Sequence, residues 1–318
     1  MKKQRIPILI FLLLINLSGC GNTSMSDPSG ENKWLLQAID RLSTVNSYEL
    51  TETRVESTTF GDKQLRTQKT SESKFIFEPF SSWSRTSSTS VKIDGSQYKS
   101  LNETYQAVKE DNLNIYMRYG HRENSEIDKE IALGEWEKVS TVPKEQMNWF
   151  LDMMRSNFDA QIYLLNSNID TFELVENEEA KDENILQYEG YLQQPTILEA
   201  YQKYIRTFYV NGKMLPNSKE MSLKDLRKEI IEGDLYEIKT GIPRLAYSEK
   251  PVPVSIWIDK STFELEKVII DETSVMQSYM EKEIPKSDPD LADPIVSKAL
   301  LTYEIKSMDD LKEIPMPD

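Results

Sequence analysis

Apolar side chains recur at intervals of three or four positions in several segments, which is the spacing of one face of an α-helix. The first segment begins near Glu31 and carries Trp34, Leu35, Ala38, Ile39 and Leu42. Pro143 opens the second and Pro195 the third, because proline favours the first turn of a helix. The second stripe is Met147, Phe150, Leu151, Met154 and Phe158; the third is Ile197, Leu198, Tyr201, Tyr204, Ile205 and Phe208, before Asn211 and Gly212.

A fourth helix is indicated by its end signals. Ser222 is placed as the N-cap residue with Asp225 three positions later, an arrangement that satisfies free backbone amides. Met221 is positioned to pack on Leu226, and Gly233 is suited to end the helix. We therefore predict a short helix that begins at residue 223.

The remaining segments favour strands. Residues 47–139 contain β-prone runs rich in Ser, Thr and aromatic residues, and the clearest alternation is Leu113, Ile115, Met117 and Tyr119. Val252, Val254, Ile256 and Ile258 alternate in the same way. Residues 259–262 predict a turn and residues 263–270 its partner strand, and residues 300–306 predict a last strand.

This order of elements predicts an α+β fold. One early helix precedes a long run of antiparallel strands, helices follow in the middle, and strands return at the end. A single curved antiparallel sheet with the helices on one face is the simplest packing that buries every apolar stripe.

The first nineteen residues have the pattern of a secretory signal peptide. Lys2, Lys3 and Arg5 precede an apolar run over residues 6–17. A twelve-residue helix rises only about 18 Å, against roughly 30 Å of bilayer hydrocarbon, so the run is too short to span a membrane.

The apolar run ends at Leu17, Ser18, Gly19 and Cys20. These four residues resemble a lipobox, the processing site of bacterial lipoproteins. The resemblance implies that Cys20 receives a diacylglyceryl group and that the peptide bond before it is cut. The alternative is that Cys20 is a free thiol after an ordinary cleavage site. We expect an acyl anchor at the extracytoplasmic face of the cell membrane.

Composition narrows the possible partners of the domain. Cys20 is the single cysteine, so no disulfide can form within the chain. Removing the signal peptide changes the formal net charge from -15 to -18, which disfavours nucleic acid and anionic lipid headgroups. The small polar residues 21–30 predict a flexible tether between the lipidated cysteine and a domain over residues 31–318.

A second resemblance concerns the fold of that domain. Asn46-Ser47-Tyr48-Glu49-Leu50 opens the first strand after an early helix, and residues 256–268 form the hairpin Ile-Trp-Ile-Asp-Lys-Ser-Thr-Phe-Glu-Leu-Glu-Lys-Val. With the lipobox, these features are similar to LolA/LppX-like envelope lipoproteins. The resemblance implies an unclosed half-barrel with helices packed on its concave face, able to hold a lipid between them. The chain is longer than that core, with a helical insertion near residues 195–232.

Catalytic and cofactor signals are weak. His121 is the only histidine, in a Gly-His-Arg context that favours a solvated loop, and there is no histidine cluster for zinc. The sequence has no Gly-x-Ser-x-Gly motif, phosphate-binding glycine loop or dinucleotide fingerprint. Asp288, Asp290 and Asp293 could hold calcium, but they lack EF-hand spacing and fit a solvated connection better. We therefore expect no enzymatic activity, metal site or cofactor.

Two functions stay open. Either the helix after Pro143 lines an apolar cavity for a hydrophobic ligand, with Met147, Phe150, Leu151, Met154 and Phe158 as candidate lining residues, or this stripe is plain core. In the second case the protein is a cell-surface interaction protein: a sensor, an assembly factor or an immunity lipoprotein. A cavity on the order of several hundred Å³ beside the helix would favour the first function. A filled core with an exposed apolar patch would favour the second.

Overall fold

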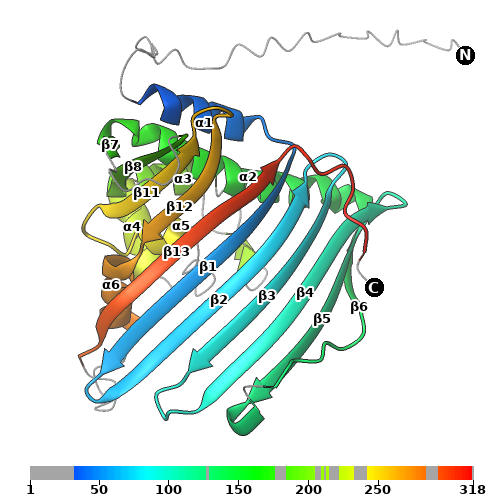
Figure 1. Cartoon of the computed structure of the whole chain (residues 1–318), viewed down its shortest axis with the longest axis horizontal. Helices are drawn as coiled ribbons and strands as arrows, with labels where there is room; N and C mark the ends of the chain where they lie inside the picture. Colours follow the sequence, from blue (N-terminus) through cyan, green and yellow to red (C-terminus); the bar gives the residue numbers. More distant parts are fainter. Residues whose placement is uncertain are drawn as a thin grey trace, which may run out of the picture.

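The computed structural model describes residues 32–126, 129–175, 184–204, 209–210, 213–214, 222–232, 242–283 and 293–316. In these ranges eleven strands form one sheet with the order β6-β5-β4-β3-β2-β1-β13-β12-β11-β8-β7. Every pair of neighbours is antiparallel, and β6 and β7 are the two edges of the sheet (Figure 1). The prediction of an unclosed antiparallel sheet accompanied by helices is confirmed.

The first six strands form a meander in which each strand pairs with the next. They are β1 (Ser47–Phe60), β2 (Lys63–Ile76), β3 (Ser81–Val91), β4 (Gln97–Lys109), β5 (Asn112–Glu123) and β6 (Glu137–Val142). Glu110 and Asp111 join β4 to β5 with φ values of 52° and 63°, as a two-residue hairpin turn of type I′ requires. The β-prone runs predicted over residues 47–139 therefore form long strands.

The other half of the sheet comes from the later part of the chain. Its strands are β7 (Glu173–Val175), β8 (Ile185–Leu192), β11 (Val252–Asp259), β12 (Glu264–Asp271) and β13 (Ile295–Met308). The predicted hairpin is confirmed as β11 and β12, with the Asp259 side chain accepting from the backbone amides of Ser261 and Thr262. β13 pairs with β1, so the last strand closes the gap between the two halves.

The four predicted helices are present and two more lie near the end of the chain. They are α1 (Lys33–Ser43), α2 (Lys144–Ser167), α3 (Gln194–Tyr204), α4 (Leu223–Glu232), α5 (Ile242–Leu245) and α6 (Thr273–Glu283). Short pieces complete the order: the 3-10 helices η1 (Asn124–Glu126) and η2 (Ile169–Thr171), and the pair β9 (Tyr209–Val210) and β10 (Lys213–Met214). Ser222 caps α4 as predicted, because the Asp225 amide donates to its hydroxyl over 3.1 Å. Met221, Gly233 and residues 205–208 and 211–212 lie outside the described ranges.

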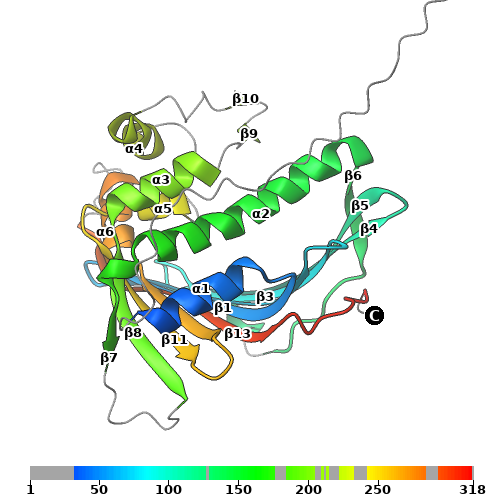
Figure 2. The ribbon, with the colours of Figure 1, turned by 90° about the horizontal axis from the view of Figure 1, so that it is seen from above.

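The two faces of the sheet differ in what lies on them. Figure 2 shows α1, α2, α3 and α4 on the same side of the sheet. The Tyr48 ring of β1 stacks on Phe158 of α2, with ring centroids 5.7 Å apart, so its face is the one toward α2. We call this the inner face and the opposite one the outer face. Side chains alternate between them along each strand.

The apolar core lies between the helices and one half of the sheet. Its fully buried side chains come from both layers and include Leu35, Ile197, Tyr188, Ile256 and Leu265. α3 packs on α2 and α4 packs on α3. The region near residues 195–232, expected to be an insertion, therefore contributes buried residues such as Leu226 to the same core.

Candidate functional site

The helix predicted to line a ligand cavity is α2, and Phe158 belongs to a packed aromatic cluster. Its ring stacks on Tyr48 and lies 5.5 Å from Phe77, while Tyr48 also stacks on Phe75 at 5.4 Å. Burial raises the pKa of the Tyr48 hydroxyl, with the nearby Arg155 guanidinium opposing the shift. The middle of α2 is therefore held against the sheet by aromatic stacking, with Phe158 half-buried against the core.

Arg155 fixes the same part of α2 to the rest of the helical layer. Its guanidinium lies 4.7 Å from the Phe77 ring centroid and donates to the Ser43 carbonyl over 2.9 Å. It also pairs with Asp159 on its own helix at 3.0 Å. α2 is therefore tied both to the end of α1 and to the aromatic cluster.

The other candidate cavity residues lie nearer the start of α2. Met147 and Leu151 are half-buried, so each keeps part of its apolar surface uncovered. The helix contacts β5 in this half of the sheet. Phe150 and Met154 belong to α2, but their side chains lie outside what the structure describes. Of the five residues, the three whose side chains are described are all half-buried, and Phe158 differs in having aromatic partners.

The inner face of the middle strands is polar. Tyr48 pairs with Phe75 and Phe75 with Ser82, so the even-numbered residues of β3 and β4 share this face. They are Ser82, Ser84, Thr86, Ser88, Ser90, Tyr98, Ser100, Asn102, Thr104, Gln106 and Val108. Asn102 Oδ1 and Gln106 Oε1 are buried and accept no hydrogen bond. This surface would favour a polar group over an acyl chain.

A buried ionic network joins the inner face to α5 and α6. Arg54 of β1 pairs with Glu272 at 3.1 Å, and Arg244 of α5 pairs with Glu56 at 2.7 Å and with Glu272 at 3.9 Å. The Glu272 side chain is 3% exposed. Burial raises the pKa of its carboxyl, although Arg54 and Arg244 act in the opposite direction. The network is placed to hold α5 and α6 onto the sheet.

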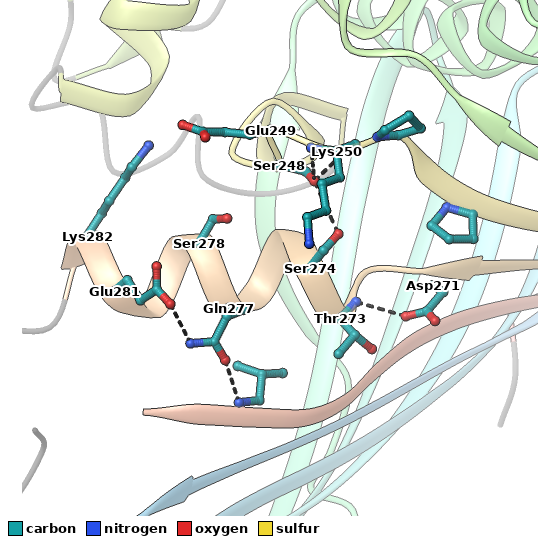
Figure 3. Close-up of a pocket in the computed structure, with 13 residues that line it drawn as sticks. Ser248, Glu249, Lys250, Asp271, Thr273, Ser274, Gln277, Ser278, Glu281 and Lys282 are labelled. Carbon is teal, nitrogen blue, oxygen red and sulfur yellow. Dashed lines mark hydrogen bonds between the residues drawn. The ribbon is translucent and has the colours of Figure 1, made fainter. Parts of the chain in front are cut away.

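A polar groove of about 650 Å³ lies between α6 and the loop before β11 (Figure 3). The loop before β11 and the exposed face of α6 form its walls, with Lys250, Ser274, Gln277, Ser278 and Lys282 among its lining side chains. Sequence reasoning missed this groove. Its hydroxyl, amide and charged residues do not follow any spacing in the sequence that is typical of a binding site.

Several lining groups of this groove are already hydrogen-bonded within the protein. The Ser248 hydroxyl donates to the Lys250 carbonyl over 2.8 Å and lies 3.1 Å from the Ser274 hydroxyl. The Gln277 amide donates to Glu281 and Pro294 and accepts from the amide at the start of β13. These contacts give the groove a structural part, anchoring β13 to α6.

The remaining candidates give no cluster of chemical groups. His121 lies in strand β5, so the expected loop position is wrong; its exposed ring stacks on Tyr98 at 6.0 Å. Asp293 is exposed, while Asp288 and Asp290 lie outside the described residues. Over the described ranges, no group of three His, Cys, Asp or Glu side chains is arranged to hold a metal ion.

The anchor residues Leu17, Ser18, Gly19 and Cys20 also lie outside the described residues, as does the tether. In the part of the chain that the structure describes, no helix is both long enough and apolar enough to cross a bilayer. A scan of protein-family models and a search of curated proteins found no significant match to this chain.

Proposed function

We propose that this protein is a lipid-anchored lipoprotein on the extracytoplasmic face of the cell membrane, and that its domain is a LolA/LppX-like half-barrel that binds a hydrophobic envelope molecule without catalysis. The observation that best supports it is the open antiparallel sheet with the long helix α2 along its inner face (Figure 2). In the resembling family, an unclosed barrel with helices on its concave face holds a lipid between these layers.

The ligand would lie beside the early turns of α2. Met147, Leu151 and Phe158 are all half-buried, but only Phe158 is packed against aromatic rings. Methionine side chains adapt to ligands of variable shape. The polar inner surface of β3 and β4 would then face the polar part of the bound molecule.

Native mass spectrometry of purified residues 21–318 tests the ligand. We expect a lipid-sized mass to co-purify, and Leu151→Ser to reduce its occupancy. Leu174→Ser, at an exposed leucine of the edge strand β7, is the matched control and should leave the occupancy unchanged. Wild-type protein free of any added mass, with no binding of a fluorescent fatty-acyl probe, would refute the carrier hypothesis.

A second candidate is a cell-surface interaction protein with no small-molecule ligand. The packing of Phe158 with Tyr48 and Phe77 favours it, because this part of the apolar stripe already has partners in the core. The two candidates differ in one measurement: binding of the fatty-acyl probe is expected for the first and absent for the second.

A further inference from the structure

Aromatic side chains lie uncovered on the inner face at one end of the sheet. Tyr119 of β5 is 69% exposed, the largest exposed fraction of any large hydrophobic side chain in the described ranges. It pairs with Asn102 of β4, which is an inner-face residue, so Tyr119 points to the same face. His121, two residues later, is also exposed, and its ring stacks on Tyr98 with centroids 6.0 Å apart. Two neighbouring strands therefore present three rings to solvent.

This end of the sheet is the one away from α2. The start of α2 lies at the opposite end, where Lys144 pairs with Asp111 of the β4–β5 turn at 2.8 Å. His121 is about 30 Å further along β5, at about 3.3 Å per residue. Figure 1 shows α2 at one end of these strands and the β3–β4 turn at the other. The exposed rings are therefore separate from the lipid position proposed beside Met147 and Leu151.

Hydroxyl groups lie beside the rings on the same face. Ser88 of β3 pairs with Ser100 of β4, and Ser100 pairs with His121, so the three form one row. Ser90 and Tyr98 are partners in the next row. In the part of the chain that the structure describes, Ser88, Ser90 and Ser100 make no side-chain hydrogen bond, and their hydroxyl oxygens are not buried. Each can therefore donate to and accept from a ligand.

Charge is absent from this face of β3 and β4. Their inner-face positions, from Ser82 to Val108, include no Asp, Glu, Lys or Arg, although 29% of the residues in the chain are charged. The adjacent strands add Lys69 beside Ser88 and Glu123 beside Tyr98, one charge of each sign. The surface therefore has no net charge, which disfavours a polyanion or a charged peptide as its ligand.

The composition of this surface matches a saccharide better than a protein. Serine is depleted at protein interfaces and under-represented among their hot spots. The inner-face positions of β3 and β4 also include no Leu, Ile, Phe or Trp that could anchor a partner side chain. A sugar ring has hydroxyl groups around its edge, and the C–H groups on its faces are attracted to the negative face of an aromatic ring. Exposed tyrosine rings beside free hydroxyls suit both features.

We propose that this end of the inner face binds an uncharged oligosaccharide. One sugar ring stacks on Tyr119 and another on the paired rings of Tyr98 and His121. The hydroxyls of Ser88 and Ser100 exchange hydrogen bonds with the sugar hydroxyls. Because the surface is an open face of the sheet, a longer glycan chain can pass over it without its ends being enclosed. The proposal does not depend on a lipid ligand beside α2.

Binding of the purified protein to an array of neutral oligosaccharides of glucose, galactose, mannose and N-acetylglucosamine tests the site. Titration calorimetry with the glycan that binds most strongly then gives dissociation constants. Tyr119→Ala should weaken binding at least about fivefold, because it removes the most exposed stacking ring. Tyr191→Ala, at a tyrosine of β8 that is 41% exposed and lies outside the surface, is the matched control and should leave binding unchanged.

The hydroxyl row has its own variant. Ser88→Ala with Ser100→Ala should also weaken binding at least about fivefold, since two hydrogen bonds are lost. The circular dichroism spectrum and the response to the fatty-acyl probe should be the same in wild type and in every variant, which separates this site from the lipid position. If no neutral oligosaccharide binds folded wild type, the proposal is wrong and a protein is the remaining occupant of this face. Unchanged binding by Tyr119→Ala, or tighter binding of heparin than of every neutral glycan, would also overturn it.

Discussion

The buried ionic network makes a quantitative prediction for Arg244→Met. The substitution keeps an unbranched apolar stem but removes the cation that pairs with Glu56 at 2.7 Å and with Glu272 at 3.9 Å. Arg244 is 11% exposed and Glu272 is 3% exposed, so water can replace little of the lost interaction. Breaking one partner out of a buried ion pair costs about 3 to 5 kcal/mol. Because Glu56 is 18% exposed, we expect about 3 kcal/mol, the lower end of that range.

The assay is urea unfolding of wild type and variant, with Lys267→Met as control. Lys267 pairs with Glu304 at 3.2 Å, but their side chains are 36% and 54% exposed, and exposed pairs contribute about 0 to 1 kcal/mol. If Arg244→Met lowers the free energy of unfolding no more than Lys267→Met does, the network does not hold α5 and α6 onto the sheet.

The cost of Arg244→Met should also depend on pH. Burial raises the folded-state pKa of Glu272, so the stability contributed by this group is present at low pH and lost as pH rises through the folded pKa. Arg244 opposes the shift, and removing it raises this pKa further. The difference in unfolding free energy between wild type and variant should therefore be largest at neutral pH. It should shrink as pH falls toward about 4, where the Glu272 carboxyl is protonated in both folded proteins. Equal losses at pH 4 and pH 8 would contradict the electrostatic explanation.

Three further predictions concern packing and the anchor. A Cβ at Gly120 would overlap the carbonyl oxygen of Ala132, so Gly120→Ala should lower the melting temperature, while Gly134→Ala, whose nearest contact would be 3.6 Å, should not, as thermal unfolding will show. Phe158 is half-buried, so Phe158→Ala should cost about 3 kcal/mol in urea unfolding, the lower end of the range for phenylalanine, and a loss below about 1 kcal/mol would mean that the aromatic cluster contributes little to stability. Cys20→Ala should leave the protein unprocessed or unanchored, whereas wild type should partition into detergent; equal partitioning of both proteins into the aqueous phase would refute the lipoprotein hypothesis.

Elements with a strong local signal could be predicted from the sequence. α1 and α3 show apolar residues at helical spacing, α4 adds the Ser222 cap, and β11 alternates cleanly. α6 was missed, because its buried residues Val275, Met276 and Met280 lie among serines and charges and follow directly after a strand. β13 is longer than the predicted residues 300–306. Its first residue, Ile295, is 65% exposed and does not continue the alternation of buried and exposed positions, so the start of the strand carries no sequence signal.

The site was harder to predict because its members meet only through the sheet. The ionic network brings Arg54 and Glu56 of β1 beside Arg244 and Glu272, which are nearly two hundred residues away in the sequence. Because 29% of the residues are charged, no individual charged residue can be recognised from the sequence as a member of such an ion pair. Only the pairing of β1 with β13, and the position of α6 just before that strand, place them together.

The division of the sheet explains where binding surfaces can develop. β11, β12 and β13 supply buried apolar residues in regular alternation, whereas β2 to β5 contribute only Ile76, Leu101 and Leu113 to the fully buried apolar set among the described residues. The meander is held mainly by its hydrogen-bonded pairs of long strands, so its side chains are less constrained by core packing. Substitutions there cost less stability than in the core, because few of them leave a cavity. The polar inner surface of β3 and β4 occurs in this half. The side chains of these strands can thus change while the core beneath α1, α2 and α3 preserves the fold.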